Sequence, residues 1–274
     1  MPPARWRALR DAVRLRAGLG LLALLGLAWS LLALPLRYLL PRMAGEQLGR
    51  HGAGATFRLY LRLLAWIGAC RFDLRALDAP RDQPACVIAP NHPSLLDAVM
   101  VISRVPDVAC IMKAQLMQSV LFGAGARLAR YIRNDSLHAM VRRAVTELRG
   151  GSPLLLFPEG TRTTRAPVNA LHGTAGLIAK YARVPVQTVF IETTDAAFLG
   201  KQSALFRRTP MPVSYRIRLG RRFDPPKNVA AFAQELEQYF RAELAAAPLA
   251  DRPSAGASVP EGRPAHDLSH GASS

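Results

Sequence analysis

Cysteine is scarce in this sequence, which has three cysteines among 274 residues. Cys70, Cys86 and Cys110 lie far apart, each in an apolar segment. An odd number of widely spaced cysteines is not the pattern of a disulfide framework, and no pair has the spacing of metal ligands. The sequence therefore predicts reduced thiols in the core of a protein from a reducing compartment, and no metal site.

Acidic residues and lysines are also few. The chain has 36 Lys and Arg residues against 19 Asp and Glu, a formal net charge of +17, and four of the basic residues are Lys. Genome composition would explain the preference for Arg over Lys, but it explains the shortage of acids less well. A surplus of this size favours a polyanionic partner, such as nucleic acid, an anionic membrane surface or a phosphate-bearing ligand. The basic residues are scattered, with no aromatic-interleaved patch, which makes nucleic acid the weaker interpretation.

The longest uncharged run covers residues 17–36 and is rich in Leu, Ala and Gly. About 20 apolar residues are needed to cross the hydrocarbon core of a bilayer. Five arginines precede the run, which favours a cytoplasmic N-terminus, and no clear cleavage site follows it, which disfavours a signal peptide. Basic residues on both flanks and Pro35 within the run leave two geometries open, a spanning helix and a bent helix in one leaflet.

A second apolar segment, residues 55–70, carries Arg58, Arg62 and Trp66 on one helical face. That pattern suits an interfacial helix with arginines near lipid headgroups, although a helix packed on the domain would show it too. We therefore expect residues 1–70 to form a basic N-terminus with membrane-associated helices. At the other end, residues 248–274 are rich in Pro, Ser, Gly and Ala and are predicted to be a disordered tail.

Residues 71–247 alternate between strand and helix patterns. This alternation predicts an α/β domain with a mostly parallel central sheet flanked by helices. The predicted strands are residues 86–89, 108–112, 130–133, 153–157, 186–191 and 213–219. The predicted helices are residues 95–104, 115–127, 136–149, 169–183 and 229–246. In such sheets, functional groups collect at the carboxyl ends of the strands.

His92 lies where an apolar run ends at Pro90 and a helical pattern begins after Pro93, and Asp97 follows within the first turns of that helix. An imidazole accepts a proton near neutral pH, and a nearby carboxylate orients the ring and stabilises its charged form. Such a pair can deprotonate a hydroxyl group for attack on an acyl carbonyl. On this spacing alone, a structural histidine at a helix start fits equally well.

Ser94 lies between the two and raises the alternative of a Ser–His–Asp triad. The Gly-x-Ser-x-Gly pattern of a nucleophile elbow is absent around it. Three groups within six successive residues are also too close along the chain for triad geometry. Direct attack by the acceptor hydroxyl is the simpler prediction. Two more histidines, His138 and His172, have no spacing that supports a metal site with His92 and Asp97.

A second polar loop, residues 157–162 (Phe-Pro-Glu-Gly-Thr-Arg), follows the apolar strand pattern at 154–156. Its glycine permits a sharp turn, and the loop presents a carboxylate, a hydroxyl and a guanidinium whose fork matches phosphate oxygens. An ordinary turn with a surface Arg–Glu pair is the alternative. Lys113 and Arg133 follow two other predicted strands, where each can contact an anionic headgroup or remain a solvated charge.

Together these segments resemble the glycerolipid acyltransferase family, whose type member is 1-acylglycerol-3-phosphate acyltransferase. Residues 91–97 (Asn-His-Pro-Ser-Leu-Leu-Asp) are similar to its His-x4-Asp block, and residues 157–162 match its Phe-Pro-Glu-Gly-Thr-Arg block at every position. Lys113 and residues 131–133 fall where the family has a Lys after a strand and an Arg in its second block. Residues 184–189 resemble its Val-Pro-led fourth block.

The resemblance implies a membrane-bound O-acyltransferase of phospholipid biosynthesis. It would move a fatty acyl group from acyl carrier protein or acyl-coenzyme A to the free hydroxyl of a lysolipid, above all 1-acylglycerol-3-phosphate, at the cytoplasmic face of the inner membrane. His92 would be the general base and Asp97 its partner. The implied substrate-binding residues are Asn91, Lys113, Arg133, Glu159, Gly160, Thr161 and Arg162. No cofactor, metal or nucleic acid is expected.

Two departures from the family pattern fall on the acceptor side. The second block often has an acid before its Arg, whereas Ile132 precedes Arg133 here. The family commonly has Phe-Lys-x-Gly where this chain has Ala-Leu-His-Gly at residues 170–173. These differences keep other acceptors open, such as a lyso-ornithine lipid or a specialised lipid. A non-catalytic membrane scaffold is a further alternative, which the intact His92 and Asp97 argue against.

Overall fold

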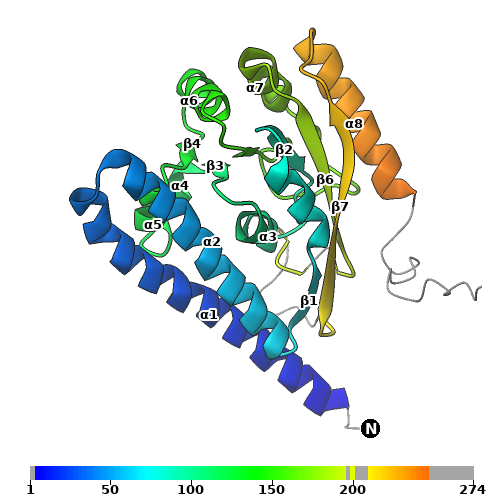
Figure 1. The fold of residues 1–274 in the computed structure, drawn as a ribbon. Coiled ribbons are helices and arrows are strands. Elements are labelled where there is room, and N and C mark those ends of the chain that lie inside the picture. The colour runs from blue at the N-terminus through cyan, green and yellow to red at the C-terminus, as the bar shows by residue number, and fades with distance from the viewer. Residues whose placement is uncertain (1–3, 196–197, 201–208, 247–274) are drawn as a thin grey trace, which may run out of the picture.

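The computed structural model describes residues 4–195, 198–200 and 209–246 (Figure 1). Seven strands form one sheet in the order β1-β7-β6-β2-β5-β3-β4. Adjacent strands are parallel except for the pair β6–β7, so the predicted mostly parallel sheet is confirmed. The strands are β1 (Cys70–Asp73), β2 (Val87–Pro90), β3 (Ala109–Met112), β4 (Ile132–Arg133), β5 (Leu154–Leu155), β6 (Val186–Thr193) and β7 (Val213–Phe223).

All six predicted strands occur, and β1 is an additional one. Its four residues alternate charged and uncharged side chains at the edge of the sheet, where they pair with β7. A segment this short, with Arg71 and Asp73 pointing one way, lacks the apolar run that identified the inner strands. The sequence pattern therefore missed the strand that joins the N-terminal helices to the sheet.

The helices are α1 (Ala4–Leu39), α2 (Arg42–Trp66), α3 (Leu96–Arg104), α4 (Ala114–Gln118), α5 (Gly123–Leu128), α6 (Leu137–Arg149), α7 (Thr174–Ala182) and α8 (Val229–Ala245), with a 3-10 segment at Arg75–Asp82. The single helix predicted at 115–127 is wrong, because the chain breaks into α4 and α5. Ser119 is extended there, and its hydroxyl accepts a hydrogen bond from the Phe122 amide. Ser side chains favour such local turns over helix interiors. The predicted tail, residues 248–274, lies outside the described residues.

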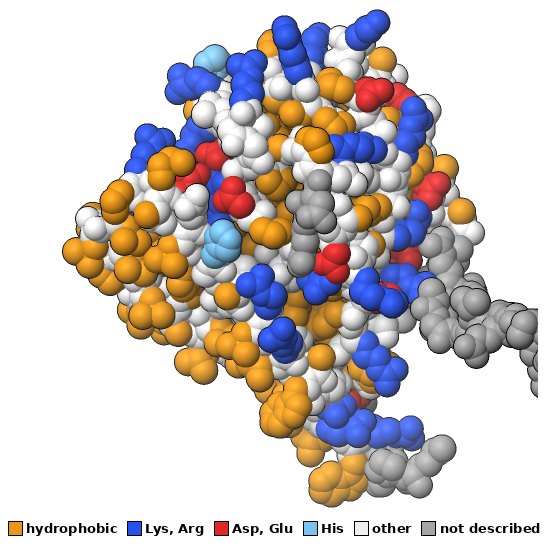
Figure 2. All heavy atoms as spheres, in the orientation of Figure 1, with side chains coloured by type: hydrophobic (Ala, Val, Ile, Leu, Met, Phe, Trp, Pro, Cys, Tyr) orange, Lys and Arg blue, Asp and Glu red, His pale blue; other side chains and the backbone are white. Residues whose placement is uncertain are grey.

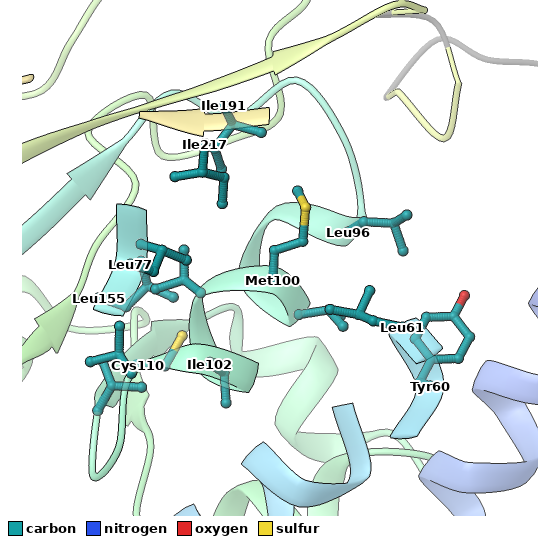
Figure 3. Packing of buried hydrophobic residues seen from close by; sticks show 14 of the residues in the cluster. Tyr60, Leu61, Leu77, Leu96, Met100, Ile102, Cys110, Leu155, Ile191 and Ile217 are labelled. Carbon is teal, nitrogen blue, oxygen red and sulfur yellow. The ribbon is translucent and has the colours of Figure 1, made fainter. Parts of the chain in front are cut away.

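Two hydrophobic cores cover the two faces of the sheet. Alternate strand residues separate them: Val87 and Ala89 of β2 pack with α6, α7 and α8, while Ile88 faces α3 and the N-terminal helices. Figure 3 shows side chains from α2, α3 and the sheet gathered in the core that contains Ile88. The three cysteines are free and buried, and burial raises the pKa of Cys70 and Cys110 to about 12. These thiols therefore stay protonated and unreactive near neutral pH.

Helices α1 and α2 form a hairpin on the side of α3 that faces away from the sheet (Figure 1). One described helix, the span Arg5–Leu39, is long and apolar enough to cross a bilayer, with a mean hydropathy of 2.2 in its most apolar window and only 17% of that window buried. A core helix of a soluble domain would be mostly covered. Figure 2 shows hydrophobic side chains gathered along this edge of the molecule. They include Leu24, Leu31, Leu32, Leu39 and Met43, all more than half exposed.

Arg50 of α2 fastens the hairpin to the α/β domain. Its side chain is buried, and its guanidinium lies 2.5 Å from Glu46, 2.7 Å from Glu147 of α6 and 3.1 Å from Asp107 in the loop before β3. Close backbone contact supports this attachment, since a Cβ on Gly49 would lie 2.4 Å from the Ala129 amide nitrogen. The hairpin is thus built into the domain and holds a defined position against it.

Candidate active site

The residues singled out by the sequence follow parallel strands and therefore meet at one edge of the sheet. His92 follows β2, Lys113 follows β3, Arg133 ends β4, and residues 157–162 follow β5. The carboxyl ends of parallel strands lie at the same edge, which explains why segments far apart in the chain converge here.

A cavity of about 640 Å³ opens at this edge. Several of its polar lining residues follow strands, and they are called the polar rim below: His92, Lys113, Asn134, Thr161, Arg162 and His172. Most of the remaining lining is apolar and includes Leu22 and Trp29 of α1, Phe57 of α2, Ile102 of α3 and Ala126 of α5. No carboxylate is among the described residues that line the cavity. The shape and charge therefore suit a ligand with an anionic head and a long apolar chain.

His92, which lines the cavity, forms a close pair with the buried Asp97. His92 Nδ1 lies 2.8 Å from Asp97 Oδ2. An ionised carboxylate only accepts, so Nδ1 carries the ring proton and Nε2 is the nitrogen left for the cavity. Burial raises the pKa of the Asp97 carboxyl, opposed by the hydrogen bonds from His92 and Ser94. Phe157 stacks on the His92 ring, with centroids 3.8 Å apart, and fixes its plane.

Ser94 is fully buried and does not line the cavity. Its hydroxyl donates to Asp97 Oδ1 at 2.8 Å and accepts from the Leu96 amide at 3.1 Å. The hydroxyl therefore bonds the aspartate and not the histidine. This geometry disfavours the Ser–His–Asp alternative.

Glu159 joins the two motif loops from behind the cavity wall. Its carboxylate is 2% exposed and accepts from the His92 amide at 2.9 Å, the Thr163 hydroxyl at 2.8 Å and the Asn169 amide at 2.9 Å. In return, the Thr163 amide donates to the His92 carbonyl at 2.7 Å. The sequence predicted that Glu159 binds substrate. In the structure its carboxylate instead accepts hydrogen bonds that hold the loop carrying His92.

Three residues of the second loop line the cavity: Gly160, Thr161 and Arg162. Their role in substrate binding stays a prediction. Gly160 has a φ of +64°, and a Cβ there would lie 3.0 Å from the ring of His172. A glycine is needed at this position for both reasons. The Arg162 guanidinium donates to the carbonyls of Leu199 and Gly200, which hold it at the rim.

Asn91 and Arg133 do not reach the cavity in this structure. The Asn91 side chain accepts from the Ile191 amide at 2.7 Å and donates to the Ile191 carbonyl at 3.0 Å, so it extends the pairing between β2 and β6. Arg133 is half exposed and pairs with Asp135 at 2.5 Å. Lys113, by contrast, lines the rim and has no ion pair within the described ranges.

Sequence reasoning missed several cavity residues. Phe157 was identified only as part of a motif, although an aromatic residue directly after a buried strand is a signal for a ring at the active-site edge. His172 was placed on the acceptor side only as a departure from the family pattern, and it lines the cavity. The wall residues of α1 and α2 had no local signal, since only the packing of the hairpin brings them to the cavity.

The fold and site define an α/β protein with a histidine–aspartate pair beside an apolar cavity and a cationic rim. A model of the Acyltransferase family matches residues 71–192. The crystal structure of the 1-acyl-sn-glycerophosphate (LPA) acyltransferase PlsC from Thermotoga maritima has the same fold, with a TM-score of 0.67 and 18% sequence identity over 90% of this chain and 99% of that chain. Residues 71–192 are therefore similar to the Acyltransferase family, and the chain shares the fold of this crystal structure.

Glu159→Gln tests whether this carboxylate supports the His92 loop. The amide has one acceptor oxygen where the carboxylate has two, so we expect a loss of about 2 kcal/mol in the free energy of unfolding, measured with denaturant in detergent. Glu235→Gln, an exposed glutamate on α8, is the control and should change stability by less than about 0.5 kcal/mol. Unchanged stability with a raised KM for substrate would instead favour direct substrate contact by Glu159.

Proposed function

We propose that this chain is a membrane-bound O-acyltransferase that moves a fatty acyl group from an acyl thioester to the free hydroxyl of a lysolipid. The thioester is carried by acyl carrier protein or coenzyme A, and 1-acylglycerol-3-phosphate is the favoured acceptor. The observation that carries the proposal is the His92–Asp97 pair, whose histidine lines a largely apolar cavity together with the cationic side chains of Lys113 and Arg162. The name of the similar PlsC protein, an LPA acyltransferase, supports the choice of acceptor.

In the proposed reaction, His92 Nε2 accepts the proton of the acceptor hydroxyl while that oxygen attacks the thioester carbonyl carbon. Asp97 stabilises the imidazolium that forms, through the bond to Nδ1. The tetrahedral intermediate then collapses with cleavage of the C–S bond, and the imidazolium returns its proton to the leaving sulfur. No acyl-enzyme is needed, in keeping with the burial of Ser94 behind Asp97.

The rim supports binding of a phosphate-bearing headgroup. Lys113 and Arg162 bring permanent positive charge to it, and His172 adds an imidazole. Arginine and lysine are the usual ligands of phosphate oxygens, and the absence of carboxylates from the described cavity wall leaves this charge uncompensated. The apolar interior supports a long acyl chain whose reactive carbonyl lies near His92.

A different acceptor is the second candidate. It is favoured by His172, which stands on the rim where the family commonly has Lys, and by Arg133, which pairs with Asp135 away from the rim. A headgroup without a phosphate monoester, such as that of a lyso-ornithine lipid, needs less positive charge at this position. The reaction at His92 would be the same.

His92→Ala tests the proposed base. We expect transfer from an acyl thioester to lysolipid to fall by about two orders of magnitude or more, since His92 is the one described side chain paired with Asp97 that can take the hydroxyl proton. His138→Ala is the matched control, because His138 is exposed on α6 and does not line the cavity. Near-normal turnover by a folded His92→Ala protein contradicts the mechanism.

We further propose that the hairpin holds the domain on the cytoplasmic face of the inner membrane. Its exposed apolar surface and the arginines that precede residue 17 support this position. We expect Leu24→Gln/Leu31→Gln/Leu32→Gln to weaken flotation with phosphatidylethanolamine–phosphatidylglycerol vesicles at least about tenfold, because each leucine loses apolar area buried in lipid. Leu137→Gln, at an exposed leucine outside the hairpin, should float as the parent does. Equal flotation of both variants argues against membrane contact through this face.

A further inference from the structure

We propose that Ser94 is a positioning residue for acyl transfer: its hydroxyl and amide hold the Asp97 carboxylate in register with His92 and set the pH at which the pair takes up a proton. The inference rests on the proposed role of His92 as base. It gives a task to a buried serine that the mechanism otherwise leaves unused.

Ser94 makes two of the three hydrogen bonds that the Asp97 carboxylate accepts from described residues. Its amide donates to Oδ2 at 2.8 Å and its hydroxyl donates to Oδ1 at 2.8 Å, while His92 Nδ1 shares Oδ2 at 2.8 Å. Donors from one residue therefore bind both carboxylate oxygens and fix the plane of the group. With that plane fixed, Oδ2 faces the imidazole.

The hydroxyl proton of Ser94 has a defined direction. The Leu96 amide donates to the same hydroxyl oxygen at 3.1 Å, which occupies one lone pair and leaves the single O–H to point at Asp97. Ser94 and Asp97 are both fully buried, so bulk water does not compete for these bonds. Hydrogen bonds from such donors favour the ionised carboxylate.

Few other titratable groups surround the pair. Tyr215 of β7 is buried against Ser94 and Asp97, and Cys70 of β1 lies behind it. The Glu159 carboxylate accepts from the His92 amide, and the groups across the cavity are Lys113, Arg162 and His172. Because the Tyr215 hydroxyl also interacts with Ser94, the test needs a variant that keeps the Ser94 hydroxyl beside one that removes it.

The direction of the effect follows from linkage. Ser94 stabilises the ionised Asp97 and so lowers the affinity of the coupled pair for a proton. Transfer requires His92 to be neutral, and activity is lost as the pH falls through the pKa of the pair. Removing the hydroxyl raises that pKa, which moves the acid limb of the kcat/KM profile to higher pH.

The experiment compares the parent with Ser94→Ala, Ser94→Thr and Ser103→Ala, using lysolipid and acyl thioester between about pH 5 and pH 9. For Ser94→Ala we expect the acid limb of the kcat/KM profile to shift to higher pH by about one unit. We also expect kcat near pH 7 to fall about tenfold, while the KM for the acceptor stays within about twofold of the parental value. Ser94→Thr keeps a hydroxyl, so its acid limb should lie at the same pH as that of the parent. Ser103 is a buried serine of α3 whose hydroxyl donates to the Met100 carbonyl, so Ser103→Ala should leave the profile unchanged.

An unshifted acid limb in folded Ser94→Ala overturns the proposal, and so does a change confined to the acceptor KM. If the alanine variant does not fold, Ser94→Cys provides the test, because a thiol of similar size is a much weaker donor and should shift the limb in the same direction. His92→Ala is measured in parallel. An inactive His92→Ala beside an unshifted Ser94→Ala removes only the role of Ser94, whereas an active His92→Ala removes the proposed function.

Discussion

The hydrogen bond between His92 and Asp97 is the interaction on which the rest of the site depends. It exists because β2 ends at Pro90 and α3 begins at Leu96, a corner that turns a buried carboxylate back toward the preceding loop. The second motif loop fixes that corner from the other side, through the Glu159 carboxylate and the stacked ring of Phe157. The two motifs are therefore one structural unit, although more than sixty residues separate them along the chain.

The hairpin of α1 and α2 is attached to the domain that carries this unit and lines part of the cavity beside it. Buried Arg50 joins α2 to α6 and to the loop before β3, so the hairpin holds a defined position on the domain. On its inner side, α1 supplies Leu22 and Trp29 to the cavity wall, and on its outer side it exposes leucines along most of its length. One pair of helices thus both completes an apolar cavity and presents an apolar surface. This arrangement fits the proposal that the chain acts on lipids at a membrane surface.

The strand pattern, the His92–Asp97 pair and the second loop could be predicted from sequence because each rests on local signals: apolar runs, a proline-bounded corner and a glycine that permits positive φ. The edge strand β1 could not be predicted, since its alternating charged residues resemble a loop. The break at Ser119 could not be predicted either, since a serine turn within this segment resembles a continuous helix. The direction of a side chain was the hardest feature to predict. Asn91 and Arg133 stand beside the right strands, yet neighbouring backbone and Asp135 hold their side chains away from the cavity.

Mass spectrometry of the lipids made by the purified protein tests the central claim most directly. The protein is given an isotope-labelled acyl thioester and an equimolar mixture of lysolipids that includes 1-acylglycerol-3-phosphate and lyso-ornithine lipid, beside the His92→Ala variant. The account predicts that label enters the free hydroxyl of a lysolipid, with the phosphate monoester preferred because Lys113 and Arg162 line the rim, and that the variant makes almost none. Label in no lysolipid, or equal labelling by the parent and His92→Ala, contradicts it.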